Sequence, residues 1–180
     1  MDRKLLYRSL MKIMVLLALT FIFYAFLEDW LAQQQTEERD HAVVDVTMLE
    51  PGAEMRVRWD GKGYLILHRT PQMIRHLRSH EEGLLDPYSE RSLQPEWAQN
   101  PLRSARPEYL VVMVPSFPGQ GECPLRYQPP GPDGAGRLMA ECNGAAYDLA
   151  GRAISGTAAR GNLVVPEYHW QTPVQLVILR

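Results

Sequence analysis

An uncharged apolar run near the start of the chain most limits what this protein can fold into. Residues 13–27 read IMVLLALTFIFYAFL and contain no acidic or basic side chain. With the residues that flank it on either side, the run is long enough as a helix to cross ~30 Å of hydrocarbon. We therefore predict a single transmembrane helix over residues 13–30, preceded by a short N-terminal segment at residues 1–12.

A cleavable signal peptide is the alternative explanation of this run. The residues that follow Leu27 read EDWLAQQQ and offer no good small-x-small cleavage site before a polar stretch. An uncleaved anchor is therefore the favoured interpretation. Residues 31–42 are polar and predict a linker, for which composition leaves both a flexible chain and a helical continuation of the anchor open.

The charges on either side of the run predict its orientation. The basic residues before it and the acidic residues after it are Arg3, Lys4, Arg8 and Lys12, then Glu28 and Asp29. Basic flanks stay on the cytoplasmic side of a membrane. The N-terminus is thus expected in the cytoplasm of a bacterial cell and the rest of the chain beyond the inner membrane, in the periplasm.

The remainder of the chain has the length and charge of one ordinary globular domain. After the anchor and linker, residues 43–180 leave room for a single core. The whole chain has 19 Lys and Arg against 21 Asp and Glu, so its charge does not indicate a nucleic-acid surface.

From residue 43 onward the pattern is that of short β-strands. The predicted strands cover residues 43–47, 54–59, 64–68, 110–114, 137–141, 145–148, 163–165 and 174–179. The 54–59 segment alternates apolar and polar side chains and is followed by Asp60-Gly61, which predicts a β-hairpin. A short helix is expected at 71–78 and a loop-rich region at 82–107. Many short strands separated by Gly and Pro predict a mainly β fold, an antiparallel sandwich or barrel.

Four blocks of sequence, in a fixed order along the domain, point to a family. The blocks are VRWDGKGYLILHRTP at 57–71, RPEYLVV at 106–112, YDLAGR at 147–152 and NLVVPEY at 162–168. Together they resemble the Rieske iron–sulfur subunit of bacterial cytochrome bc1 complexes: its opening hairpin, the strand before its first cluster loop, and the segments after its second. The resemblance runs from about residue 43 to 180 and implies a Rieske-like head domain.

The two cluster loops are where this sequence departs from that family. In the family the first loop reads CTHLGCxP and the second CPCHGS, and the first Cys and the His of each loop hold a [2Fe–2S] cluster. Aligned on its final proline, the first loop here reads FPGQGECP, with Phe117 at the cysteine position and Gly119 at the histidine position. Aligned on its glycine, the second loop reads AECNG, with Ala140 and Asn143 at the corresponding positions. None of these four residues supplies a thiolate or an imidazole, so we expect no cluster, no other cofactor and no metal in this domain.

The resemblance also implies a use for the two cysteines. In the family the second Cys of each loop forms a disulfide that ties the loops together; Cys142 falls on that position and Cys123 lies within one residue of its counterpart. An exported domain in an oxidising compartment favours pairing of two such cysteines. We therefore predict a structural Cys123–Cys142 disulfide, with a redox switch as the alternative.

The remaining candidate ligands are weaker. His76 and His80 have the i, i+4 spacing that can place two imidazoles on one helix face. The segment around them, MIRHLRSHEE, is highly polar, so a solvated helix face is the favoured interpretation over a metal site.

These features predict a protein that keeps a membrane anchor and a Rieske-like head but lacks a cluster. The favoured hypothesis is a non-catalytic accessory subunit of a respiratory electron-transfer complex, in contact with cytochrome b-like and c1-like subunits or with oxidase subunits. Phe117, Pro118 and Pro124 would then form an apolar tip that docks on a partner, or Phe117 would fill the space of the missing cluster. Two alternatives stay open: a periplasmic thiol–disulfide sensor or assembly factor, and a Rieske-type electron-transfer subunit of quinol–cytochrome c reductase.

Overall fold

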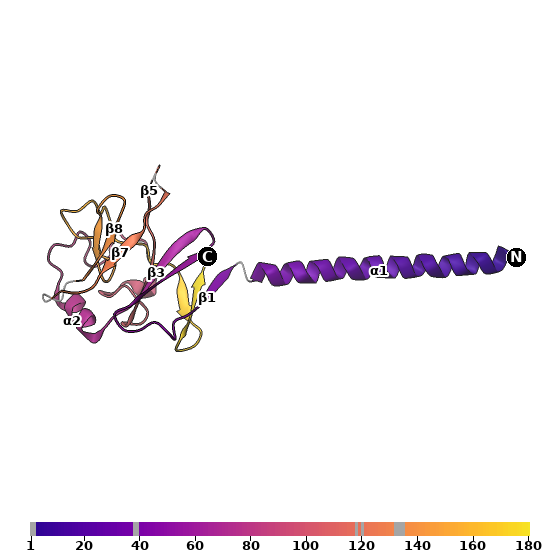
Figure 1. Cartoon of the computed structure of the whole chain (residues 1–180), viewed down its shortest axis with the longest axis horizontal. Helices are drawn as coiled ribbons and strands as arrows, with labels where there is room; N and C mark the ends of the chain where they lie inside the picture. The colour runs from indigo at the N-terminus through magenta and orange to yellow at the C-terminus, as the bar shows by residue number, and fades with distance from the viewer. Residues whose placement is uncertain (1–2, 38–39, 118, 120, 132–135) are drawn as a thin grey trace. The chain divides into compact units, whose positions relative to one another are not determined.

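A computed structural model describes residues 3–37, 40–117, 119, 121–131 and 136–180 of the chain. The chain separates into two compact units, Met1–His41 and Ala42–Arg180, each described here by itself. Figure 1 labels their helices and strands.

The first unit is dominated by one long helix, α1, which covers Arg3–Glu37 without interruption. Its segment Leu10–Glu28 is 19 residues long, apolar and exposed, which suits a membrane-spanning helix by length and composition. The helix continues through residues 31–37, so this part of the predicted linker is helical. The first strand already begins at His41, two residues before the predicted start of the head domain at 43.

The second unit, the head, is built from small sheets with one short helix. The first sheet has the order β1-β11-β10, from His41–Asp45, Gln175–Leu179 and Tyr168–Trp170; the second has the order β2-β3-β4, from Glu54–Trp59, Lys62–His68 and Tyr109–Met113. The third has the order β7-β8-β9, from Leu125–Gln128, Arg137–Ala140 and Ala146–Asp148, and β5 at Ser116–Phe117 pairs with β6 at Gly121–Glu122. The helical elements are α2 at Pro71–Ser79 and the 3-10 turn η1 at Glu96–Ala98. Pairing within the last three of these sheets and between β10 and β11 is antiparallel, which confirms the predicted mainly β head.

The β2–β3 hairpin forms as its sequence predicts. Trp59 pairs with Lys62, so Asp60 and Gly61 make a two-residue turn. Both turn residues have positive φ, 48° and 71°, the backbone that this tight turn requires and that Asp-Gly tolerates. The turn fixes the register, which places Arg56 and Arg58 on one face of the hairpin.

The short helix α2 is also a consequence of local sequence. Thr70 stands at its N-cap and accepts the Met73 amide hydrogen on its hydroxyl at 3.3 Å, and Pro71 follows at the first helical position. Met73 and Leu77, one turn apart, are the residues that the helix buries.

The core of the head lies around β3 and β4. The β3 residues Tyr64, Leu65, Ile66 and Leu67 and the β4 residues Leu110, Val111 and Val112 are at most 3% exposed. Because the centre of β3 is flanked by β2 and β4 and is buried on both faces, residues 64–67 form a continuous buried run instead of alternating with exposed polar residues.

The strand predicted at residues 163–165 is wrong. Its backbone groups bond to three different segments: Leu163 N donates to Gly151 O at 2.8 Å, Val165 N donates to Leu93 O at 3.2 Å, and Val164 O accepts from Met113 N at 2.9 Å. An apolar run becomes a strand only when one neighbour pairs with it along its length. The strand in this part of the chain is β10, three residues further on, where β11 supplies that neighbour.

The long loop between α2 and β4 is organised by the carboxylate of Asp86. Its oxygens accept hydrogen bonds from Glu90 N at 2.9 Å, Arg91 N at 3.1 Å and the Ser92 hydroxyl at 2.6 Å. Burial disfavours the charged carboxylate, but these hydrogen bonds outweigh it and hold the pKa of Asp86 below its usual value of 3.8.

Asp86→Asn is therefore expected to change the acid sensitivity of the head. A carboxylate with a lowered pKa in the folded state adds stability that is present above the unfolded-state pKa and is lost as the pH falls through the folded-state pKa. The variant should lose about 1–2 kcal/mol at pH 7 through its weakened hydrogen bonds, and its stability should decline less steeply than that of the wild type below about pH 4. Denaturant titrations over a pH series measure both; an equally steep acid decline in the variant would contradict the assignment.

Candidate functional site at the loop tip

Two loops meet at one end of the head and are joined covalently. We call them the tip loops: the β5–β6 hairpin with the residues up to Pro124, and the turn between β8 and β9 together with Ala140, the last residue of β8. Figure 1 shows β5 standing out from the head in the vicinity of β7 and β8. The tip loops contain all four positions at which the resemblance would place cluster ligands.

A disulfide joins the tip loops, as predicted. It links Cys123 to Cys142 with a Cα–Cα distance of 5.7 Å. The loops are also hydrogen-bonded to each other beside it, because Cys142 N donates to Cys123 Sγ at 3.0 Å and Glu141 N donates to Pro124 O at 3.0 Å. Cys123 is fully buried and Cys142 is exposed, so the bond is anchored in the core at one end and reaches the surface at the other.

On the first tip loop, Phe117 and Gly119 occupy different environments. Phe117 is half-buried and packs against the hydrophobic core. Gly119 is exposed and has a φ of 77°, in the left-handed region that favours glycine. A side chain at 119 would have open space, yet its backbone would be strained by about 1–2 kcal/mol.

On the second tip loop, Ala140 and Asn143 are both engaged in the turn itself. Ala140 is fully buried; its N–H donates to Ala145 O at 2.8 Å and its carbonyl accepts from Gly144 N at 3.0 Å. The Asn143 side-chain oxygen accepts the Ala145 amide hydrogen at 3.0 Å, which is an Asx turn. The Asn143 side chain is therefore oriented by the backbone of its own turn.

The histidine pair lies away from the tip loops, on and just after α2. The rings of His76 and His80 stack with centroids 3.9 Å apart, and His80 Nδ1 lies 2.9 Å from the exposed Ser79 hydroxyl. Across the described residues, no group of three or more His, Cys, Asp or Glu is placed so that it could hold a metal ion.

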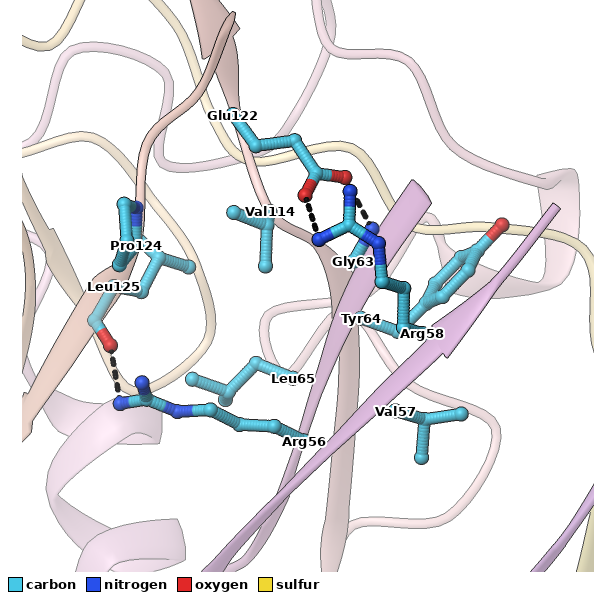
Figure 2. A pocket seen from close by; sticks show the side chains of 10 residues that line it. All are labelled: Arg56, Val57, Arg58, Gly63, Tyr64, Leu65, Val114, Glu122, Pro124 and Leu125. Atoms are coloured by element: carbon cyan, nitrogen blue, oxygen red, sulfur yellow. Dashed lines mark hydrogen bonds and ion pairs between the residues drawn. The ribbon is translucent and has the colours of Figure 1, made fainter. Parts of the chain in front are cut away.

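A cavity beside the tip loops was not foreseen from the sequence. It measures about 420 Å³ and lies between the β2–β3 hairpin and residues 122–125. Figure 2 shows Arg56 reaching toward Leu125 and Arg58 reaching toward Glu122, with Leu65 and Val114 between them. The sequence signal that could have indicated it is the alternation of Arg56 and Arg58 in β2, which places both on one face of the hairpin.

Glu122 links the first tip loop to this hairpin. One of its carboxylate oxygens accepts the Gly63 amide hydrogen, and the other lies 3.0 Å from Arg58 Nη1. Gly63 also packs closely on Val114, because a Cβ at position 63 would lie 3.0 Å from the Val114 side chain. The Glu122 carboxylate therefore holds the first tip loop against the β2–β3 hairpin.

Comparisons with known proteins show which sequences this chain resembles. The chain is 37% identical over 141 residues to the ubiquinol–cytochrome c reductase iron–sulfur subunit of Allochromatium vinosum, covering 74% of this chain and 67% of that protein. It is 33% identical over 128 residues to the subunit of the same name from Blastochloris viridis, covering 71% of this chain and 64% of that protein. Against the mitochondrial cytochrome b-c1 complex subunit Rieske of Schizosaccharomyces pombe the identity is 31% over 149 residues, or 81% of this chain and 58% of that protein.

The anchor-like helix, the antiparallel head with two disulfide-linked tip loops and these similarities define one class of protein. The chain belongs to the family of Rieske iron–sulfur subunits of ubiquinol–cytochrome c reductase. It spans about two thirds or less of the length of these relatives. No protein-family model matches the chain.

Proposed function

We propose that this protein is a membrane-anchored, cluster-free Rieske-like subunit that supports the structure, assembly or docking of a respiratory electron-transfer complex. The observation that carries the proposal is the set of residues at the four ligand positions. A phenyl ring, a hydrogen atom and a methyl group have no donor atom, and the side-chain amide of Asn143 is a poor ligand for iron in a sulfur-rich site. Cys123 and Cys142 are paired with each other and supply no thiolate.

The local backbone supports the same conclusion. A histidine at 119 would carry the strain of a left-handed backbone, and the backbone groups of Ala140 are committed to a tight turn. The residues present therefore do not fit a [2Fe–2S] cluster, and no electron-transfer step through such a cluster is proposed. The retained fold and anchor support an interaction role instead.

The proposed arrangement in the cell follows from the charges around the apolar run. Residues 1–12 lie in the cytoplasm, residues 13–30 cross the inner membrane of a bacterium, and residues 31–42 lead to a periplasmic head formed by residues 43–180. Partners in this arrangement are integral membrane subunits of a cytochrome bc1-like complex or of a terminal oxidase.

One purification tests the proposal through two measurements. The tagged full chain, extracted from its native membranes in mild detergent, is expected to contain far less than one iron per chain and to give no Rieske-type EPR signal. Mass spectrometry is expected to find respiratory subunits bound at a fixed ratio. Stoichiometric iron with a Rieske-type signal would instead establish the alternative suggested by the relatives' names, an electron-transfer subunit.

A second candidate function rests on the exposure of Cys142. A thiol–disulfide sensor or assembly factor needs a disulfide that the thiol of a partner can reach. Cys142 is exposed, so this end of the disulfide is on the surface. Recovery of thiol oxidoreductases as mixed disulfides, without respiratory subunits, would favour this function over the first.

A further inference from the structure

A second cavity borders the first tip loop. It measures about 400 Å³, which is within the size range of small-molecule binding sites. Its wall comes from β4, from the first tip loop, from β9 and from residues 162–164. The apolar residues of this wall are Met113, Val114, Pro115, Leu163 and Val164. A ligand in the cavity would therefore be surrounded largely by apolar atoms.

Tyr147 brings an unused hydrogen-bond donor to this cavity. It lies on β9 and is 4% exposed, and its hydroxyl forms no hydrogen bond with any described residue. The hydroxyl is not completely enclosed by protein atoms, in contrast to that of Tyr127. Because Tyr147 lines the cavity, its hydroxyl opens on it. Burial raises the pKa of the Tyr147 phenol above its usual value of 10.0, so the phenol keeps its proton at neutral pH and can donate.

The acceptors around the cavity are already used by the protein. Glu122 uses both carboxylate oxygens, and Asn162 Oδ1 accepts from Ala153 N at 2.8 Å. The backbone carbonyls of the wall that accept hydrogen bonds from elsewhere in the head are those of Pro115, Leu163 and Val164. A ligand that brings its own acceptor oxygen therefore satisfies the Tyr147 hydroxyl, which the protein leaves without a partner.

Lys62 adds a positive charge at the rim of the cavity. Lys62 is exposed, and its ammonium group takes part in no ion pair or hydrogen bond with the described residues. The nearby carboxylates have cations of their own, because Glu122 pairs with Arg58 at 3.0 Å. Asp60, close to Lys62 in the chain, pairs with Arg180 at 3.4 Å. An acceptor that carries a negative charge therefore suits this cavity better than a neutral one.

We propose that this cavity binds a small organic molecule with an apolar body and a carboxylate group. The carboxylate accepts a hydrogen bond from the Tyr147 hydroxyl, and the Lys62 ammonium group balances its charge. The apolar body packs on Met113 and Leu163. This binding site is additional to the proposed role in a respiratory complex and does not depend on it.

Binding of para-fluorobenzoate to the detergent-solubilised full chain tests the proposal. Broadening of the fluorine NMR line measures the dissociation constant, which is expected to be ~1 mM or tighter for a probe of this size. Tyr147→Phe deletes only the hydroxyl and should weaken binding roughly tenfold. The matched control, Tyr127→Phe, deletes another hydroxyl that has no partner but lies outside the cavity, and should bind the probe as the wild type does.

A further variant and a neutral probe test the role of charge. Lys62→Gln should weaken binding of para-fluorobenzoate roughly threefold and leave binding of para-fluorobenzamide unchanged. Tyr147→Phe should unfold at the wild-type temperature, because the hydroxyl has no partner within the fold. The proposal is overturned by an absence of binding to the wild type, by equal affinities of the wild type and Tyr147→Phe, or by equal affinities of the wild type for the two probes. A lower Tm of Tyr147→Phe would also overturn it, since the hydroxyl would then be used by the protein itself.

Discussion

Replacement of Cys142 by alanine is expected to lower the free energy of unfolding of the head by about 3 kcal/mol. The disulfide closes a loop with a sequence separation of 19, and its loss lets the unfolded chain explore conformations that the crosslink forbids. For a domain of this size the loss corresponds to a fall of roughly 10 °C in Tm. Thermal unfolding of the detergent-solubilised full chain, followed by near-ultraviolet circular dichroism, measures it.

Two comparisons separate the crosslink from side effects of the substitution. Wild-type protein treated with a reductant should unfold near the temperature of the Cys142→Ala variant, because both lack the same crosslink. Cys123→Ala should be somewhat less stable than Cys142→Ala, because Cys123 is fully buried and its replacement also removes core volume. A Cys142→Ala variant that unfolds at the wild-type temperature would show that the tip loops hold together without the bond.

Arg152→Met is expected to destabilise the head by about 3–5 kcal/mol. Arg152 is fully buried and its Nε lies 2.7 Å from Asp148 Oδ2. Its Nη2 also donates to Leu77 O at 3.0 Å and His80 O at 3.2 Å, which ties the end of α2 to the turn after β9. Methionine fills much of the volume of Arg152 but cannot donate to the Asp148 carboxylate or to the carbonyls of Leu77 and His80. Polar groups that lose a hydrogen-bond partner in a buried site destabilise the folded state.

A surface pair in the same molecule provides the control for Arg152→Met. Arg126 and Glu141 are 2.8 Å apart, almost the same separation, but their side chains are 67% and 43% exposed. Because water solvates both side chains in the folded and in the unfolded state, Arg126→Met should lower the free energy of unfolding by at most about 1 kcal/mol. Denaturant titration of both variants measures the difference; equal losses would mean that burial does not decide the strength of the Arg152–Asp148 pair.

The parts of the fold that short-range chemistry controls were predictable from the sequence. The β2–β3 hairpin depends on an Asp60-Gly61 turn between alternating segments, and α2 on Thr70 and Pro71 at its start. In each case the decisive residues are within a few positions of the element that they define. The same is true of the apolar run in α1, whose length and composition suit a membrane span.

The errors and omissions of the sequence analysis have a common physical cause. Residues 163–165 are as apolar as a strand, but three separate segments take their backbone hydrogen bonds. Arg152 gives no local sign of burial, because its carbonyl partners on and after α2 lie more than 70 residues away along the chain. The cavity likewise depends on residues 122–125 being folded against β2 and β3.

For the candidate site, the identity of the residues came from the sequence and their environment from the tertiary structure. The residues at the four ligand positions, and a family relationship strong enough to pair Cys123 with Cys142, could be read from the order of the motifs. Only the folded head decides that Phe117 packs on the core, that Asn143 is used by its own turn, and that Tyr147 keeps a free donor beside an apolar cavity. The sequence determines the type of each side chain, whereas its burial and its unused hydrogen-bonding capacity depend on which distant segments pack together.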